Sequence, residues 1–451
     1  MINLPSEFLD RMKYMLGNEY FNFIDSYEKT SYRGIRVNTL KCSISKLKKI
    51  IGFKLERTNF SDLNFYIPQN IEALGKNPLH HAGAFYIQEP SASSAVTALN
   101  PSGHDKVLDL CAAPGGKSTQ IAASLDSNGL LWSNEIVRKR ANILISNIER
   151  MGIRNAVVSS IHPDILCSEL EGYFDKVLVD APCSGEGLFR KNPEAIKEWG
   201  YNHVIACSKR QISILNSASK AVKTGGILVY STCTFSKEEN EEVIEKFLRQ
   251  NKNFELTEIE SKFGRHAYNC ENINLEKARR IYPMDKGEGH FVAKLRKIDG
   301  LDNCNSLCDY RIFKNAPKEA YKSYYDIFKT DPFGELVEIS DKVFIVPKFL
   351  PDISKIPILR AGVLFGELKK SRVEPAHNVF MASKPNEIKN VIDLEINSEN
   401  IKNFLRGEEI EVNSELQGYT GVSVESIMVG FGKASNARLK NKYPKGLRNI
   451  N

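Results

Sequence analysis

Two cysteines that each follow an apolar run are the residues of this sequence best suited to covalent chemistry. DKVLVDA (175–181) leads through Pro182 to Cys183, and GILVYST (226–232) leads to Cys233. Carboxyl ends of parallel strands meet at one ligand-binding edge, so we expect both thiols in one pocket. Either cysteine alone would be interpreted as a small buried hydrophobic residue. The pair favours a thiolate nucleophile, activated by Lys237 and the helix it opens, but spacing does not say which thiol attacks.

One carboxylate accompanies the thiols. Asp180 directly precedes Ala181 and Pro182, at the end of the same predicted strand as Cys183. A carboxyl group there can protonate or hydrogen-bond a ring nitrogen of a bound base, so we predict Asp180 as a general acid.

A glycine-containing loop follows the first apolar run and is the predicted cofactor site. KVLDL (106–110) continues into CAAPGGKSTQ, where Gly115 and Gly116 let the backbone approach a ligand closely. No glycine stands where a phosphate-binding P-loop requires it. Glu135 closes the next predicted strand, where an acid accepts hydrogen bonds from a ribose. Lys117 is unfavourable at a helix start, which suggests pairing with Asp180 or with a cofactor carboxylate. These features predict a nucleoside cofactor.

The elements that must position these residues alternate between strand and helix. Predicted helices cover 118–125, 137–151, 202–222 and 237–250, and predicted strands cover 106–110, 129–135, 156–160, 175–181, 226–232 and 290–296. Such alternation is typical of βαβ units on a parallel sheet. The predicted fold class is therefore α/β, with a doubly wound, Rossmann-like domain.

The flanking regions have a different character. Helical patterns at 5–16 and 19–27 precede an extended GIRVNTL, and the segment from about 374 is rich in β-type residues. We predict four regions: a small N-terminal α+β region at 1–75, the Rossmann-like domain at 76–298, an accessory domain at 299–373, and a β-rich domain with a basic tail at 374–451.

Composition excludes several classes of protein. The 451 residues are 42% hydrophobic and 26% charged, without an apolar stretch long enough to span a membrane and without an N-terminal signal pattern. The nine cysteines are scattered and odd in number, and Cys304 and Cys308 lack a second ligand pair. We expect a cytoplasmic monomer with no metal and no membrane partner.

Charge points to a polyanionic partner. The formal net charge is +7, and the stretch 432–451 contains no acidic residue. Its basic residues, the footprint of a phosphate-binding tail, are Lys433, Arg438, Lys440, Lys442, Lys445 and Arg448. A merely solvated basic end is an equally good interpretation of this stretch alone.

Together, CAAPGGKS, DAPCSGEG and YSTCTFSKEENE resemble the Sun-domain family of RNA 5-methylcytosine methyltransferases. The resemblance is to its bacterial RsmF-like branch, which modifies small-subunit ribosomal RNA. It continues through FLDRMKYMLG, RGIRVNTL, HHAGAFYIQEPSAS, GEGHFVAKLRK and LKNKYPKGLR, and so covers nearly the whole chain. It implies a class I methyltransferase domain that uses S-adenosylmethionine, a PUA-like RNA-binding domain at the C-terminal end, and RNA binding by the N-terminal region at 1–75.

The resemblance also implies roles for single residues. Cys233 becomes the nucleophile, Cys183 assists product release, and Asp180 lies at both the cofactor and the cytosine. Glu135 would bind the cofactor ribose, and Arg140 would join the cofactor site. The loop residues implied to contact S-adenosylmethionine are Cys111, Ala112, Ala113, Pro114, Gly115, Gly116 and Lys117.

Three alternatives remain at this point. The same chemistry could act on transfer RNA, since the motifs describe only the base and the cofactor. A non-catalytic ribosome-assembly factor would be expected to lose a cysteine or the loop, and both are intact. A small-molecule methyltransferase would not explain the paired cysteines or the basic stretch.

Overall fold

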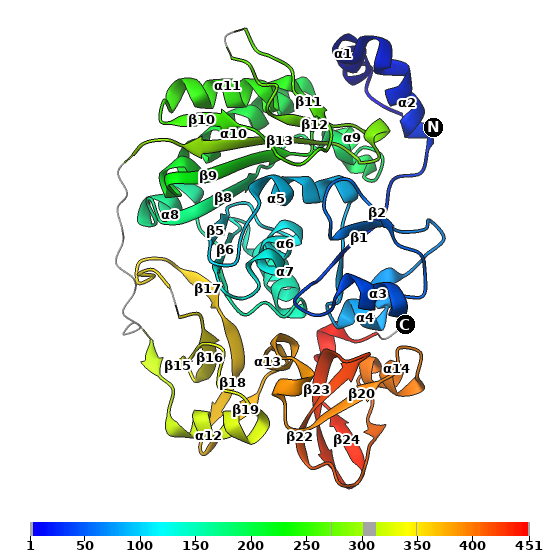
Figure 1. Ribbon diagram of the computed structural model, residues 1–451, viewed down its shortest axis with the longest axis vertical. Helices are drawn as coiled ribbons and strands as arrows, with labels where there is room; N and C mark the ends of the chain where they lie inside the picture. Colours follow the sequence, from blue (N-terminus) through cyan, green and yellow to red (C-terminus); the bar gives the residue numbers. More distant parts are fainter. Residues whose placement is uncertain (1–2, 272, 301–312, 349, 450–451) are drawn as a thin grey trace.

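Four β-sheets organise the computed structural model, which describes residues 3–271, 273–300, 313–348 and 350–449 (Figure 1). The central sheet carries the predicted Rossmann-like domain. One smaller sheet precedes it in the chain and two follow it. Within the described residues, no helix is long and apolar enough to cross a bilayer.

The parallel part of the central sheet has the strand order β7-β6-β5-β8-β9. The strands are β5 (Lys106–Asp109), β6 (Leu130–Asn134), β7 (Ala156–Ser159), β8 (Phe174–Asp180) and β9 (Val222–Thr232). Chain progression reverses between β5 and β8, which is the switch point where doubly wound sheets bind ligands. This order confirms the predicted fold class.

Antiparallel strands complete both sides of the sheet. Beside β9 lies β13 (His290–Lys297), followed by β12 (Arg279–Ile281) and β11 (Arg265–His266), while β10 (Phe254–Thr257) also pairs with β13. On the other side, β17 (Ile358–Ala361) pairs with β7. A strand from the C-terminal third thus covers an edge that would otherwise be open.

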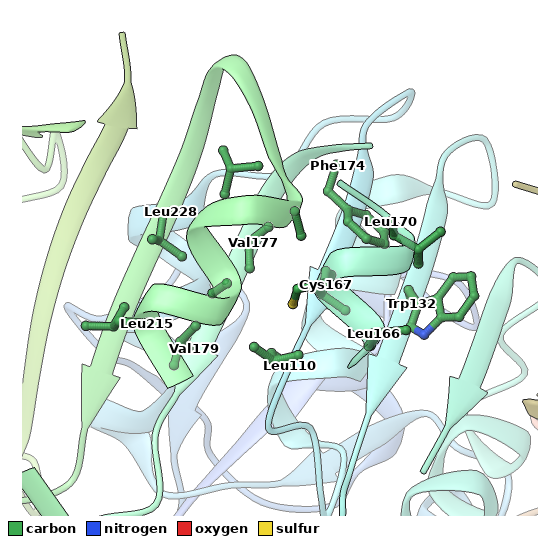
Figure 2. Close-up of a cluster of buried hydrophobic side chains, with 14 of the residues drawn as sticks. Leu110, Trp132, Leu166, Cys167, Leu170, Phe174, Val177, Val179, Leu215 and Leu228 are labelled. Atoms are coloured by element: carbon green, nitrogen blue, oxygen red, sulfur yellow. The ribbon is translucent and has the colours of Figure 1, made fainter. Parts of the chain in front are cut away.

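Helices cover both faces because the sheet residues are apolar on both sides. One face packs α5 (Ser94–Leu99), α6 (Gly116–Leu125) and α7 (Arg138–Arg150). The other packs α8 (Pro163–Glu169), α10 (Tyr201–Ala221) and α11 (Glu241–Gln250). Figure 2 shows the second face, where side chains of α8 and α10 meet those of β8 and β9.

One predicted helix is interrupted. The span 237–250 consists of a 3₁₀ turn, η5 (Lys237–Glu239), and then α11, with Asn240 between them at φ −115° and ψ −94°. The Asn240 side chain accepts a hydrogen bond from Thr232 Oγ1 at 2.6 Å and donates one to the Thr234 carbonyl at 3.0 Å. These bonds hold Asn240 outside helical geometry.

The N-terminal region contains both predicted helices, α1 (Ser6–Leu16) and α2 (Tyr20–Glu28), joined by η1 (Gly17–Glu19). A four-stranded sheet with the order β2-β3-β1-β4 follows. Its elements, with the helices between them, are β1 (Gly34–Val37), α3 (Ile44–Ile50), β2 (Glu56–Arg57), β3 (Asn64–Tyr66), η2 (Leu74–Lys76), α4 (Pro78–His81) and β4 (Phe85–Ile87). The sheet therefore continues to residue 87.

Two further sheets form the C-terminal third. The first comprises β14 (Lys314–Asn315), β15 (Glu335–Ile339), β16 (Lys342–Val346), β18 (Val363–Lys369) and β19 (Arg372–Pro375), with α12 (Lys318–Ile327) and α13 (His377–Ala382) nearby. The second comprises β20 (Val391–Leu394), β21 (Ile410–Glu411), β22 (Gly418–Val424), β23 (Ile427–Ser435) and β24 (Arg438–Asn441), with α14 (Glu399–Arg406).

The basic stretch is folded, and is not a tail, over the residues that the structure describes, 432–449. Lys433 lies on β23, and Arg438 and Lys440 lie on β24, all three exposed. Lys442 forms an ion pair with Glu374 at 2.9 Å. The expectation of a tail was wrong because alternate residues of this stretch, such as the buried Leu439, pack into the last sheet.

The first and last domains share one core, although they lie far apart in the sequence. Ile35 and Phe85 of the first sheet belong to the same buried cluster as Phe404 and Val422 of the last domain. In Figure 1, α3 and α4 lie beside the C-terminal end of the chain.

The packing of α8 predicts opposite outcomes for two neighbouring residues. Leu166 is fully buried, whereas the side chain of Ile165 is 52% exposed. Leu166→Ala should lower the free energy of unfolding by about 2–5 kcal/mol, because it leaves a cavity under the sheet. Ile165→Ala, the matched control, should change it by less than about 0.5 kcal/mol. Urea unfolding of the two variants checks this, and equal losses would contradict the burial of Leu166.

Candidate active site

A cavity of about 630 Å³ opens at the carboxyl ends of the parallel strands. Each of four strands contributes a predicted residue to its wall: Cys111 after β5, Glu135 after β6, Asp180 at the end of β8 and Cys233 after β9. Cys183, Ala113 and Arg140 also line it. Lining residues that carried no sequence-based prediction include Ile136, Val137, His162, Leu188, Arg210, Ser213 and Ser217.

Five of the predicted loop residues do not line this cavity: Ala112, Pro114, Gly115, Gly116 and Lys117. They form the turn into α6, in which Gly115 has a φ of +114°, a conformation that favours glycine. A Cβ there would also lie 3.2 Å from Leu144 Cδ1 of α7. The turn into α6 therefore packs closely against α7.

The two cysteines lie side by side, with Sγ of Cys183 3.3 Å from Sγ of Cys233. The hydrogen bond to Cys233, burial and the negative charge of Glu239 raise the pKa of the Cys183 thiol well above its usual value. Cys183 is thus a neutral thiol at neutral pH. Burial, together with the nearby charge of Asp109, also raises the pKa of Cys111, which makes it a poor nucleophile.

The cation beside the thiols is not the one expected from the sequence. The ammonium group of Lys237 lies 4.5 Å from the centroid of the Tyr268 ring. Lys117 is instead the lysine that interacts electrostatically with Cys233. The expectation for Lys237 was wrong because its ammonium group contacts the Tyr268 ring and Lys237 does not line the cavity.

Asp180 forms the ion pair that the sequence suggested for Lys117. Lys117 Nζ donates to Asp180 Oδ2 at 2.7 Å, and Ser231 Oγ of β9 donates to Oδ1 at 2.7 Å. Burial raises the pKa of Asp180, but Lys117, His290 and Ser231 together lower it below its ordinary value. The carboxylate is therefore ionised at neutral pH, and in this state it accepts hydrogen bonds.

His290 is a buried neighbour of this ion pair. Burial and the charge of Lys117 lower its pKa to about 4, so the imidazole is neutral at pH 7. Its Nδ1 lies 3.2 Å from Ser91 Oγ. The segment GEGHF predicts no role for this histidine, because nothing in the sequence shows that β13 lies next to β9.

Glu135 and Arg140 form the opposite wall. Glu135 is 3% exposed; its Oε1 accepts a hydrogen bond from the Val137 N–H at 2.9 Å, and its Oε2 lies 3.2 Å from the Arg140 guanidinium. Arg140 also donates to the Ala113 carbonyl at 2.9 Å. The arginine therefore joins the acid after β6 to the loop after β5.

A buried arginine of the N-terminal sheet supports the glycine turn from below. Arg36 of β1 donates to the Gly116 carbonyl at 2.5 Å and to Thr119 Oγ1 at 2.6 Å. Burial lowers its pKa to about 9. The only sequence signal for Arg36 was its place in RGIRVNTL, and its contacts depend on how the two domains dock.

Among the described residues, no three His, Cys, Asp or Glu side chains come together as a metal site requires. Cys304 and Cys308 lie outside the part of the chain that the structure describes.

Family models match four successive segments of the chain. They are the N-terminal domain of 16S rRNA methyltransferase RsmF (4–90), 16S rRNA methyltransferase RsmB/F (96–296), the first C-terminal domain of the RsmF rRNA methyltransferase (323–382) and the methyltransferase RsmF PUA domain (391–449).

Relatives match over almost the full length. Ribosomal RNA small subunit methyltransferase F of Vibrio campbellii is 32% identical over 99% of this chain and 98% of its own length. The enzyme of the same name from Aliivibrio fischeri is also 32% identical, with the same coverage.

Solved structures match about two thirds of the chain. A methyltransferase homologue from Pyrococcus horikoshii is 31% identical with a TM-score of 0.57, covering 66% of this chain and 96% of its own. NSun6 from the same organism, described with SFG, is 25% identical with a TM-score of 0.58, covering 66% of this chain and 99% of its own. By its sequence along the whole length, the chain belongs to the RsmF family of small-subunit ribosomal RNA methyltransferases.

Proposed function

We propose that this protein methylates carbon 5 of a cytosine in small-subunit ribosomal RNA, with S-adenosylmethionine as the methyl donor and Cys233 as the covalent nucleophile. The observation that carries the proposal is the pair of thiols, 3.3 Å apart, in a cavity whose wall also includes Asp180, the ion-pair partner of Lys117. A methyltransferase acting on a nucleophilic atom would need no such pair.

The residues present fit S-adenosylmethionine. The buried Glu135 can accept hydrogen bonds from the ribose hydroxyls, held in place by Arg140. Cys111 and Ala113 also line the cavity, and the turn at Gly115 keeps the loop close to it. When bound, the cofactor supplies an electrophilic methyl group.

Cys233 supplies the activation that cytosine lacks. Carbon 5 is not nucleophilic in the free base; addition of the Cys233 thiolate to carbon 6 converts it into an enamine-like carbon. The electron pair released from the C5–C6 double bond is available for the new bond to methyl. Lys117 is the cation that interacts electrostatically with Cys233.

Asp180 holds the base. As an ionised carboxylate it accepts a hydrogen bond from the 4-amino group of cytosine, with Lys117 and Ser231 fixing its orientation. The general-acid role expected from the sequence requires Asp180 first to take up a proton. Thiolate addition increases the basicity of ring nitrogen 3, which favours a proton shared between that atom and the carboxylate.

Cys183 assists release. After methyl transfer a base must remove the proton on carbon 5, so that the C5–C6 double bond reforms and the bond to Cys233 breaks. The hydrogen bond and charge of Cys233 raise the pKa of Cys183 in the free enzyme. Both are lost once Cys233 is bonded to carbon 6, so Cys183 becomes more acidic in the covalent intermediate, where its thiolate is needed.

Ribosomal RNA is the substrate that the relatives favour, since those cited are named for the small subunit. Transfer RNA is the second candidate, because the residues around the thiols recognise a base and not its sequence context. A paired cytosine cannot reach the cavity, so the base must be single-stranded or flipped. Exposed lysine and arginine side chains of β23 and β24 would hold the surrounding backbone.

Replacement of the nucleophile tests the mechanism. Cys233→Ala should lower methyl transfer by at least about a thousandfold, because carbon 5 is no longer activated, while affinity for S-adenosylhomocysteine changes by less than about threefold. Transfer of radiolabelled methyl to a 16S transcript and calorimetry measure the two. Cys167→Ala, a buried cysteine of α8 outside the cavity, is the control. A fully active Cys233→Ala would refute the mechanism.

Removal of the second thiol should trap the intermediate. Cys183→Ala leaves the attacking thiol intact but slows loss of the carbon 5 proton, so a covalent protein–RNA adduct should accumulate. The adduct is detected as a shifted band on a denaturing gel that requires both RNA and cofactor. Normal turnover without any shifted band would argue against a role for Cys183 in release.

Charge neutralisation on the last domain tests RNA binding. The triple variant of Lys433, Arg438 and Lys440 to alanine should weaken binding of a 16S transcript. It should also lower the magnitude of the slope of log affinity against log salt by about two, because each of the three lost phosphate contacts contributes about 0.7. A matched triple variant of the exposed Lys252, Lys262 and Lys277, in the methyltransferase domain, is the control. Equal slopes for the two triple variants would show that β23 and β24 do not contact the RNA.

A further inference from the structure

A buried carboxylate joins the loops that carry the two cysteines. Glu186 lies in η4 (Glu186–Leu188), three residues after Cys183, and is 1% exposed. Its Oε2 accepts hydrogen bonds from Thr234 Oγ1 at 2.7 Å and from the N–H groups of Phe235 and Ser236 at 2.7 and 2.9 Å. Its Oε1 accepts one from Ser236 Oγ at 2.6 Å. The carboxylate thus binds the three residues that directly follow Cys233.

A second carboxylate makes the reciprocal connection. Glu239, six residues after Cys233, accepts hydrogen bonds from both the N–H, at 3.0 Å, and the hydroxyl of Ser184, the residue after Cys183. Ser184 Oγ in turn lies 2.8 Å from Thr234 Oγ1. Each cysteine loop therefore provides an acid that binds the other loop.

The backbone makes the same junction tight. The Gly187 N–H donates to the carbonyl of Cys233 itself at 2.9 Å. A Cβ at Gly187 would lie 2.9 Å from that oxygen and 3.0 Å from the Gly289 carbonyl, which leaves no space for a side chain. The position of Cys233 thus depends on the segment that contains Glu186.

Five hydrogen bonds hold the carboxylate of Glu186 in place, and Arg11 interacts with it electrostatically from beyond ion-pairing distance. Among the described residues no cation lies within ion-pairing distance of it, and Trp199 Nε1 donates the remaining hydrogen bond to Oε1 at 2.9 Å. A buried carboxylate held this way is stable only while its donors keep their places, so it orders the chain around it.

We propose that Glu186 is a positioning residue, which holds the loop of Cys233 against the loop of Cys183 so that both thiols face one base. This rests on the proposed function of the two cysteines. Thiolate addition and proton removal occur at adjacent carbons of one ring, and a misplacement of about 1 Å costs about 100-fold in rate. Glu186 acts through Thr234, Phe235 and Ser236 and does not line the cavity.

Glutamine is a sharp test, because no orientation of its amide satisfies the site. Placed at Oε2, the NH₂ group would face the N–H groups of Phe235 and Ser236; placed at Oε1, it would face Trp199 Nε1–H. Glu186→Asp keeps two acceptor oxygens on a shorter chain. Glu194→Gln, on the neighbouring α9 (Pro193–Glu198), replaces a carboxylate that is 66% exposed and is the matched control.

The readout is the single-turnover rate of covalent adduct formation with a 16S transcript made with 5-fluorocytidine, which blocks release. Glu186→Gln should slow it about 100-fold, with dissociation constants for the transcript and for S-adenosylhomocysteine within about threefold of the parent. Glu186→Asp should recover part of the rate, and Glu194→Gln should match the parent. A parent-like rate for Glu186→Gln would overturn the proposal.

Two further experiments distinguish a failure of the positioning role from a failure of the proposed function. If circular dichroism shows that Glu186→Gln does not fold, Ser236→Ala replaces it, because this variant removes one hydrogen bond to Glu186. Ser236→Ala should slow adduct formation without changing the dissociation constants. A parent-like rate for Ser236→Ala would overturn the proposal. An adduct formed by Cys233→Ala would refute the proposed function, whatever Glu186 does. Parent-like Glu186→Gln beside an inert Cys233→Ala would refute only the positioning role.

Discussion

The pairing of β8 with β9 is the constraint on which the rest of the site depends. In the observed register Asp180 is opposite Ser231, and the hydroxyl of Ser231 donates to the Asp180 carboxylate. The two cysteines follow this pair by three and two residues, which brings their sulfur atoms to 3.3 Å. A slip of one residue would turn alternate side chains to the opposite face of the sheet and separate the thiols.

Buried charged groups then fix the geometry of the loops that follow these strands. Lys117 with Asp180 is a partly buried ion pair, Arg280 with Glu241 is a fully buried one, and Glu186 is a buried carboxylate held by hydrogen bonds. Such groups contribute little net stability, because desolvation offsets their attraction. Their directional hydrogen bonds instead restrict the loops to one geometry. The hydrogen bond to Cys233 and burial keep Cys183 neutral, whereas Lys117 and Ser231 keep Asp180 ionised against the effect of burial.

The flanking domains pack directly against the methyltransferase domain and against each other. β17 extends the central sheet at β7, the first and last domains share a core, and Arg36 reaches from the N-terminal sheet to the turn at Gly116. The basic residues of β23 and β24 are therefore held by packed elements at a defined distance from the thiols. An RNA bound across these domains would meet the cavity without a flexible tether.

Local sequence determined the strands, most helices and the order of the motifs, because apolar periodicity and turn residues are local properties. It brought Cys183, Cys233, Asp180 and Glu135 to one sheet edge, since parallel strands end together. It did not separate the roles of the thiols, which came from family resemblance. Only the tertiary structure decided that Lys117 and not Lys237 accompanies Cys233, that Lys442 of the basic stretch pairs with Glu374, and that Arg36, Glu186 and His290 support the site. These contacts join segments tens to hundreds of residues apart, and no local pattern records which segments dock.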